Sequence, residues 1–214
     1  MSFGVVQRSS GVRLGCVTAV SVTTGAFSTS ARTRAWIAAA VFVLLSTPHI
    51  SAAIAGDVPE LEGYRTDDYR APVPLTLKGA RTIDADDAEK IVREGRALFV
   101  DVYPRAKKPP NLPKGTIWRD PTHMSMKGAH WLPNVGYGVL SDEFEDYFKT
   151  RLATLTENDP ARPVVFFCQR NCWMSWNAAK RALEWGYTDV LWFSEGTDAW
   201  QEHGFDLVKV EPVP

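Results

Sequence analysis

The sequence predicts a single α/β domain with a mostly parallel central sheet flanked by helices. Two short apolar runs, residues 97–100 and 164–167, have the length and the apolar content of buried strands. Helix-like segments separate them along the chain, which is typical of parallel strands joined by crossover helices. The runs end at Asp101 and Cys168. Functional groups in such sheets gather at the carboxyl ends of strands, so we expect these two residues at one edge.

Residues 1–55 predict a cleavable signal peptide. They contain four basic residues and no acidic one, and the apolar run 35–45 follows two arginines. Small residues lead up to Ala55, so we expect cleavage after Ala55 and a periplasmic location. The run is shorter than the roughly 20 residues that cross a bilayer, so no stable membrane anchor is expected. The alternatives are an uncleaved anchor, a start downstream of Met1, and an organelle transit peptide.

Charge and cysteine content narrow the expected partners. Without residues 1–55 the chain keeps 20 basic residues against 25 acidic ones. An acidic chain with no basic cluster beyond Lys107-Lys108 argues against nucleic acid or an anionic membrane as partner. Cys168 and Cys172 remain after cleavage, and an oxidising compartment would allow them to pair. No second Cys or His pair stands at ligand spacing beside these two cysteines, so we expect no metal and no cofactor.

The domain is expected to span residues 81–214, behind an extended segment at residues 56–80. Prolines and charged residues interrupt that segment, so it has no core of its own. Asp84 is the predicted N-cap of a short helix that ends at Gly95, because the apolar residues between them fall on one helical face. The first strand follows and delivers Asp101, whose alternative role is a structural acid that caps a neighbouring turn.

A proline-rich loop is predicted at residues 104–113, because proline removes hydrogen-bond donors and restricts the residue before it. We expect this loop to form a wall or lid over the functional site, with a plain surface insertion as the alternative. Residues 115–118 resemble a strand fragment. His123 and His130 flank a methionine-containing turn and are interpreted as loop histidines.

The second half of the chain predicts alternating strands and helices. Caps and apolar periodicity mark the helices, and short apolar runs mark the strands. The expected elements are a strand at 131–135, a helix that Ser141 caps and that extends to about residue 155, the strand at 164–167, a helix from about Ser175 to Trp185 that Gly186 ends, a strand at 190–193, and a turn at 195–200 into a short helix.

The turn from Cys168 to Cys172 carries the strongest chemical signal. Free backbone N–H groups and the helix dipole favour an anion at a helix start, and a thiolate is such an anion. This position favours nucleophilic sulfur chemistry. The alternative is two small buried residues or a structural disulfide. Trp173 and Trp176 flank the turn and suggest an apolar rim for a hydrophobic or planar ligand, although tryptophan is more often a core residue.

Residues 82–205 resemble the rhodanese-like domain. More narrowly, residues 168–181 resemble the bacterial family that is named for a CxxCW-type motif and associated with catabolism by pyrroloquinoline quinone (PQQ) dependent dehydrogenases. The resemblance implies that Cys168 becomes a persulfide, which the backbone N–H groups of its loop cradle. It is carried by the opening helix, Asp101-Val102 at a strand end, the Gly-Ala-His-Trp-Leu-Pro segment at 128–133, the strand into Cys168, and Glu195-Gly196 with Trp200.

The resemblance also implies a set of site residues. Cys168 and Cys172 are the expected catalytic residues. Arg170 would attract an anionic sulfur donor, unless it is a solvated surface arginine. The expected substrate-binding residues are Gln169, Arg170, Asn171, Trp173 and Asp101.

Three departures from the family pattern qualify this expectation. Three residues, not two, separate the cysteines, and Tyr103 stands where rhodaneses have the arginine of Asp-Val-Arg. The cysteine loop also lacks glycine and the arginine that closes a phosphatase loop, since Trp173 and Met174 stand near that place. Phosphatase or arsenate reductase activity is therefore not expected.

Two functions remain open at this stage. The first is an exported sulfurtransferase that moves sulfur between a small sulfur donor and a thiol acceptor through Cys168, linked to PQQ-dependent alcohol catabolism. The second is an accessory module in which the cysteine pair shuttles between dithiol and disulfide, or only fixes the loop. In the second reading the protein binds a quinoprotein dehydrogenase or its cytochrome.

Overall fold

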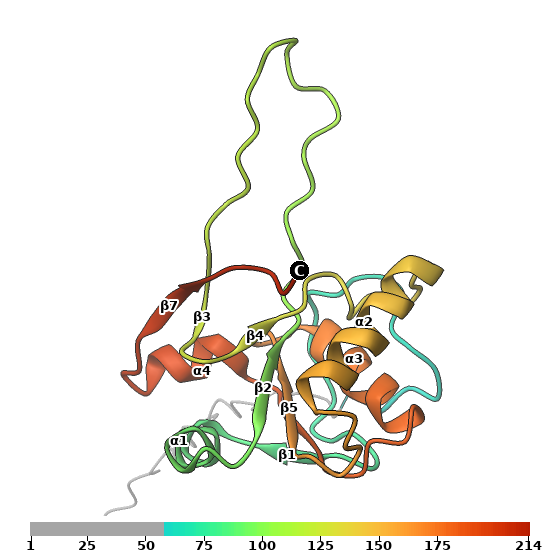
Figure 1. The fold of residues 1–214 in the computed structure, drawn as a ribbon, viewed down its shortest axis with the longest axis vertical. Helices are drawn as coiled ribbons and strands as arrows, with labels where there is room; N and C mark the ends of the chain where they lie inside the picture. Colours follow the sequence, from blue (N-terminus) through green and yellow to red (C-terminus); the bar gives the residue numbers. More distant parts are fainter. Residues whose placement is uncertain (1–57) are drawn as a thin grey trace, which may run out of the picture. The chain divides into compact units, whose positions relative to one another are not determined.

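Five parallel strands form the central sheet, in the order β1-β6-β5-β2-β4 (Figure 1). The computed structural model describes residues 58–214, and the predicted signal peptide, residues 1–55, lies outside them. Every pair of neighbouring strands in this sheet is parallel, which confirms the predicted α/β class. The strands are β1 (Arg81–Ile83), β2 (Leu98–Asp101), β4 (His130–Trp131), β5 (Val164–Phe167) and β6 (Val190–Phe193).

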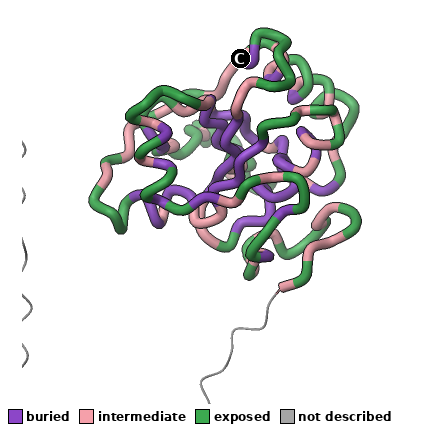
Figure 2. Tube along the Cα trace, turned by 90° about the horizontal axis from the view of Figure 1, so that it is seen from below, coloured by how far each residue is buried: buried purple, intermediate pink, exposed green. Residues whose placement is uncertain are grey.

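Helices cover both faces of this sheet. Side chains alternate along β5, so Val164 and Phe166 enter one hydrophobic core while Val165 and Phe167 enter the other. The two cores meet at the central strands β2, β5 and β6, in which every residue is buried (Figure 2). The first core includes residues of α2 (Asp142–Leu155) and α3 (Trp173–Glu184), and the second includes residues of α1 (Ala85–Glu94) and α4 (Gly196–Glu202).

The predicted helix caps are confirmed for two helices. The Asp84 carboxylate accepts a hydrogen bond from Asp87 N at 2.9 Å, and Gly95 ends α1 in the left-handed conformation. The Ser141 hydroxyl caps α2 by accepting from Phe144 N at 3.4 Å.

Helix α3 starts two residues earlier than predicted. Cys172 is its N-cap residue, and the Ser175 hydroxyl donates to the Cys172 carbonyl oxygen at 3.1 Å instead of capping the helix. The cysteine turn therefore leads into the helix with no spacer.

The short strands are where the sequence prediction was wrong. His123 and His130 were interpreted as loop residues, but they begin β3 (His123–Met126) and β4. β3 pairs with β7 (Leu207–Val210) in a separate antiparallel sheet, and the predicted strand at residues 115–118 does not form. Strands of two to four residues carry too little periodicity to be found by pattern.

Two long segments lie outside the helices and strands. The strap, residues 64–77, lies within the extended segment expected at residues 56–80, and it contributes Leu77, which is 3% exposed, to the core around α3. The arm, residues 104–122, contains no helix or strand and projects away from the sheet (Figure 1). It extends nine residues beyond the predicted loop, and its tip lies far from the helices and strands (Figure 1).

Candidate functional site

Cys168 and Cys172 are joined by a disulfide at the carboxyl end of the central strand β5. Their Cα atoms lie 6.3 Å apart, and each residue is 1% exposed. β5 is flanked by β2 and β6, so the strand that delivers Cys168 is held on both sides. The two predicted catalytic residues therefore lie together. The sequence left open whether these cysteines pair, and in the structure they form a disulfide. The segment from Cys168 to Cys172 is called the cysteine loop below.

Helix α4 begins directly against the cysteine loop. Thr197 donates to the Cys168 carbonyl oxygen through its backbone N, at 3.0 Å, and through Oγ1, at 3.3 Å. A side chain on Gly196 would collide with that same carbonyl group. Gly196 also has a positive φ of 52°, so its conformation and its close approach both require glycine. The start of α4 thus fixes the backbone of the first cysteine.

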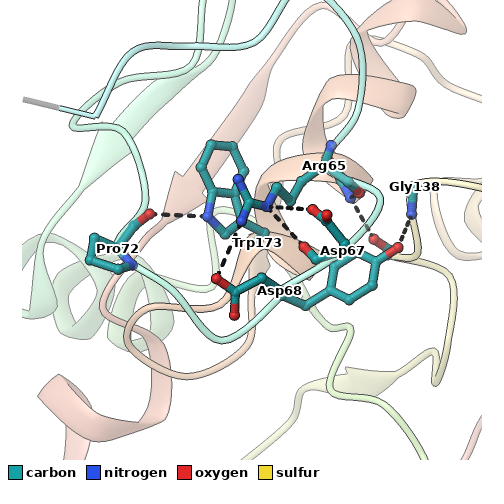
Figure 3. Close-up of polar contacts among 9 residues, drawn as sticks. Arg65, Asp67, Asp68, Pro72, Gly138 and Trp173 are labelled. Atoms are coloured by element: carbon teal, nitrogen blue, oxygen red, sulfur yellow. Dashed lines mark hydrogen bonds and ion pairs between the residues drawn. The ribbon is translucent and has the colours of Figure 1, made fainter.

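The strap runs over the start of α3 and contacts Trp173 (Figure 3). Trp173 N donates to the Tyr69 carbonyl oxygen at 3.0 Å, and its indole Nε1 donates to the Pro72 carbonyl oxygen at 3.0 Å. Trp176 Nε1 donates to the Thr76 carbonyl oxygen at 3.2 Å. Trp173 and Trp176 are 1% and 0% exposed. Both side chains therefore lie in the core under the strap, as the alternative of core tryptophans expected, and they do not form an exposed rim.

Asn177 and Arg65 form further contacts between the strap and α3. The Asn177 side chain accepts from Arg65 N at 3.0 Å, and donates at 2.9 Å to both the Arg65 and the Gly136 carbonyl oxygens. The Arg65 guanidinium lies over the Trp173 ring, 5.5 Å from its centroid, and pairs with the neighbouring carboxylates of Asp67 and Asp68 (Figure 3). No sequence signal placed the strap against the cysteine-bearing helix.

Carboxylates hold the partly exposed side chain of Arg170. Its guanidinium donates two bonds of 2.6 Å to Glu202 and lies 3.3 Å from Glu195, and its backbone N donates to Asp198 at 3.2 Å. Hydrogen bonding to Arg170 lowers the pKa of Glu202, and bonding to Glu202 raises the pKa of Arg170. The backbone N–H groups of Arg170 and Trp173 are both already bonded, so neither is free to cradle a sulfur anion.

Asp101 is fully buried at the carboxyl end of β2, beside the end of β5 that leads into Cys168, so the two residues share one edge as expected. Its carboxylate accepts from Ser125 Oγ at 2.5 Å, from Tyr103 N at 2.8 Å and from His123 Nε2 at 2.8 Å. This arrangement fits the alternative role of a structural acid that caps a turn, and a substrate-binding role would need an exposed carboxylate. The His123 ring also stacks against Tyr103, with centroids 4.9 Å apart. Sequence reasoning missed His123, because no pattern linked it to Asp101.

Two clefts border the cysteine loop. One has a volume of about 510 Å³ and is lined by Arg170 and Asn171 together with residues of the strap and β1. The other, of about 360 Å³, is lined by Gln169, His123 and Thr197 and by the base of the arm. The base of the arm thus forms part of a cleft wall, as the wall alternative for this loop expected. The three predicted substrate-binding residues Gln169, Arg170 and Asn171 all border open space.

Metal-ligand clusters and membrane-spanning helices are both absent from residues 58–214. Within this part of the chain, no three His, Cys, Asp or Glu side chains are grouped to hold a metal ion. No helix in the same part is long and apolar enough to span a membrane.

Residues 84–203, more than half of the chain, match the family model of the rhodanese-like domain. No curated protein matches the chain.

Solved structures with similar folds include sulfur-handling proteins. A thiosulfate sulfurtransferase from Pseudomonas aeruginosa is 18% identical over 63% of this chain, which spans only 21% of that enzyme, with a TM-score of 0.43. A polysulfide-sulfur transferase homodimer from Wolinella succinogenes is 21% identical over 61% of this chain and 80% of its own, with a TM-score of 0.38. A rhodanese-like domain from Anabaena is 15% identical over 62% of this chain and 85% of its own, with a TM-score of 0.41.

Proposed function

Because the chain belongs to the rhodanese-like domain family, we propose that it transfers sulfane sulfur through a persulfide on Cys168. The observation that carries this proposal is the place of Cys168, at the end of the central parallel strand and in the turn that enters a helix. A nucleophile at this place is held by a rigid strand on one side, and its loop borders two clefts that could admit substrates.

The disulfide must open before Cys168 can act. One thiol of a dithiol reductant attacks one sulfur of the Cys168–Cys172 bond and releases the other cysteine as its thiolate. The second thiol of the reductant then displaces the attacked cysteine from the mixed disulfide. Two electrons and two protons pass to the protein, which gains two thiols, while the reductant becomes a disulfide. The resting state is therefore inactive, and a reducing partner is the first requirement of the cycle.

The sulfur transfer itself takes two displacements. The Cys168 thiolate attacks the outer sulfur of thiosulfate, forms a persulfide and releases sulfite. A thiophilic acceptor such as cyanide then takes the terminal sulfur, leaves as thiocyanate and restores the thiolate. The clefts beside Gln169 and Arg170 provide room for the donor and the acceptor.

Cys172 adds a second outcome to this cycle. Its thiolate can attack the Cys168 sulfur of the persulfide, form the disulfide again and release hydrosulfide. The two cysteines are close enough for this step, since they form the disulfide in the structure. With a dithiol present, the net reaction converts thiosulfate and dithiol into sulfite, sulfide and oxidised dithiol.

Formation of thiocyanate and sulfide by the reduced protein tests the proposal. We expect Cys168→Ser to lose both products, and Cys172→Ser to lose sulfide while its thiocyanate yield rises several-fold, because the competing attack is gone. Asn111→Ser, in the arm, is the control for substitution itself. Thiocyanate formation that is unchanged in Cys168→Ser would sink the proposal.

A second function, a thiol–disulfide redox module, is favoured by the closed disulfide and the bonded N–H groups of the loop. In this case the pair exchanges electrons with a partner and transfers no sulfur. Counting free thiols in protein from its native compartment separates the two. A stable disulfide that a partner protein reduces, with no persulfide in the mass spectrum, supports the redox module.

We further propose that the protein is exported to the periplasm and serves PQQ-dependent alcohol catabolism, with a quinoprotein dehydrogenase or its cytochrome as partner. The support is the sequence of residues 1–55 and the motif resemblance at residues 168–181. The mass of the intact mature protein tests export, because cleavage after Ala55 gives one defined value. If the link to PQQ holds, deleting the gene for this protein should slow growth of the bacterium on alcohols and leave its growth on sugars unchanged.

A further inference from the structure

Arg170 is the cation of the cysteine loop, and its guanidinium is already occupied. Nη1 and Nη2 each donate at 2.6 Å to one carboxylate oxygen of Glu202, and Nη2 lies 3.3 Å from Glu195 Oε1. Two parallel bonds to one carboxylate are the strongest arrangement that arginine forms. An anion that approaches Arg170 must therefore displace a glutamate.

Carboxylates outnumber cations by five to two among the described residues that contact Arg170 or line the cleft beside it. The second cation is Arg70, whose Nη1 donates to the Arg170 carbonyl oxygen at 3.0 Å. A net negative charge repels anions and concentrates cations, most strongly at low ionic strength. The five carboxylates belong to Asp84, Asp87, Glu195, Asp198 and Glu202.

We infer that Glu195 and Glu202 are specificity-determining residues, which direct the cysteine loop toward thiols and persulfides with a neutral or positively charged substituent and away from small anions. This rests on the proposed chemistry at Cys168. With such a persulfide, the Cys168 thiolate takes the outer sulfur and the carrier leaves as its thiolate, so no oxidant is needed. Doubly charged thiosulfate is then a poor donor, and the expectation that Arg170 attracts an anionic donor is reversed.

Reduction of the Cys168–Cys172 disulfide by three small thiols tests this inference without any sulfur transfer. Cysteamine, 2-mercaptoethanol and mercaptoacetate share one chemistry and carry a positive, a neutral and a negative substituent. Rates per thiolate, measured by counting free thiols, should fall in that order by roughly fivefold to tenfold from first to last at low salt. The order should flatten or reverse in Glu195→Gln/Glu202→Gln.

The matched control is Glu94→Gln/Glu157→Gln. These glutamates also form surface ion pairs, with Arg96 and Arg162, but they lie in or next to connections that lead into the amino ends of β2 and β5. The control should keep the wild-type order of rates. If mercaptoacetate reduces the wild-type protein as fast as cysteamine, or if the control flattens the order equally, the inference is wrong.

Two further measurements cover the remaining outcomes. If the double variant does not fold, added salt should compress the wild-type order, because screening acts on the same charges. In the sulfur-transfer assay the KM for thiosulfate should fall several-fold in Glu195→Gln/Glu202→Gln. If the protein transfers no sulfur but keeps the order of reduction rates, the proposed function is wrong and the charge selection stands. If it transfers sulfur but shows no such order, only the charge selection is wrong.

Discussion

At the scale of single residues, Gly196 controls how closely α4 approaches the first cysteine. Its backbone lies against the Cys168 carbonyl group with no room for a Cβ atom, and Thr197 then binds that carbonyl oxygen twice. The geometry of Cys168 therefore depends on a residue that carries no functional group. Glycine at such a place is required by the approach of two backbones.

Gly196→Ala is expected to destabilise the protein by about 3 kcal/mol, from the steric clash and from the left-handed backbone together. Gly204→Ala is the matched control, because Gly204 also has a positive φ but has open space around its Cβ position, so it should cost only about 1 kcal/mol. Urea unfolding measures both. Equal losses in the two variants would show that the approach of α4 is not tight.

His130 gives the fold a dependence on pH. Burial, with a contribution from the Arg162 charge, lowers the pKa of His130 below its ordinary value of 6.5. The unfolded chain then binds more protons than the folded one as pH falls through 6.5, so stability decreases toward acid pH.

The melting temperature should fall between about pH 7.5 and 5.5, and His130→Gln should reduce this fall, because glutamine does not titrate. Differential scanning calorimetry across this range measures both proteins, with the values near pH 7.5 as the internal reference. Parallel curves for the two proteins would assign the fall to other groups.

At the scale of elements, the strap and α3 act as one unit. Trp173, Trp176 and Asn177 each satisfy a buried polar group through a strap residue, over a separation of about a hundred positions. The strap also takes the first N–H group of α3, which a bound anion would otherwise use. It thus stabilises the helix that carries Cys172 and limits the anion-binding capacity of the loop.

Asn177→Ala should destabilise the protein by about 3 kcal/mol, because it leaves the Arg65 backbone and the Gly136 carbonyl oxygen without partners. Limited proteolysis should then cut within the strap. Asn111→Ala, at an exposed place in the arm, is the control and should leave stability unchanged. A loss below about 1 kcal/mol would mean that the hydrogen bonds of Asn177 contribute little to holding the strap.

The helices were predictable from sequence because their ends carry local chemistry. Asp84, Gly95 and Ser141 form the caps that were expected. The strap was not predictable, because its partners lie a hundred residues away and its own sequence has no periodicity. Cys168 and Cys172 were recognisable from their neighbours, whereas the pairing of His123 with Asp101 depends on sheet packing that no local pattern encodes.

At the scale of the whole molecule, the described chain separates a basic arm from an acidic body. The arm holds five basic residues and one acidic one, while the other described residues hold 15 basic and 23 acidic ones. One pair closes the base of the arm, where Arg105 Nε donates to Asp120 at 2.6 Å. Beyond this pair the arm contains exposed residues such as Ile117, which is 81% exposed.

Replacing residues 107–117 with a short glycine-serine linker should change the free energy of unfolding by less than about 0.5 kcal/mol, because the arm adds little to either core and loop length has a weak effect on stability. Urea unfolding of the shortened and the complete protein measures this. A loss of several kcal/mol would show that the arm packs on the body in solution.

The placement of the strap has a consequence for the order of assembly. Its residues are synthesised before the domain they cover, yet their hydrogen-bond partners in α3 follow about a hundred residues later. Contacts of such long range form late, after the loop-closure entropy has been offset by other structure. The strap is therefore synthesised before the domain that it covers but docks after it, and the cysteine-bearing helix lacks these contacts until α3 itself has been made.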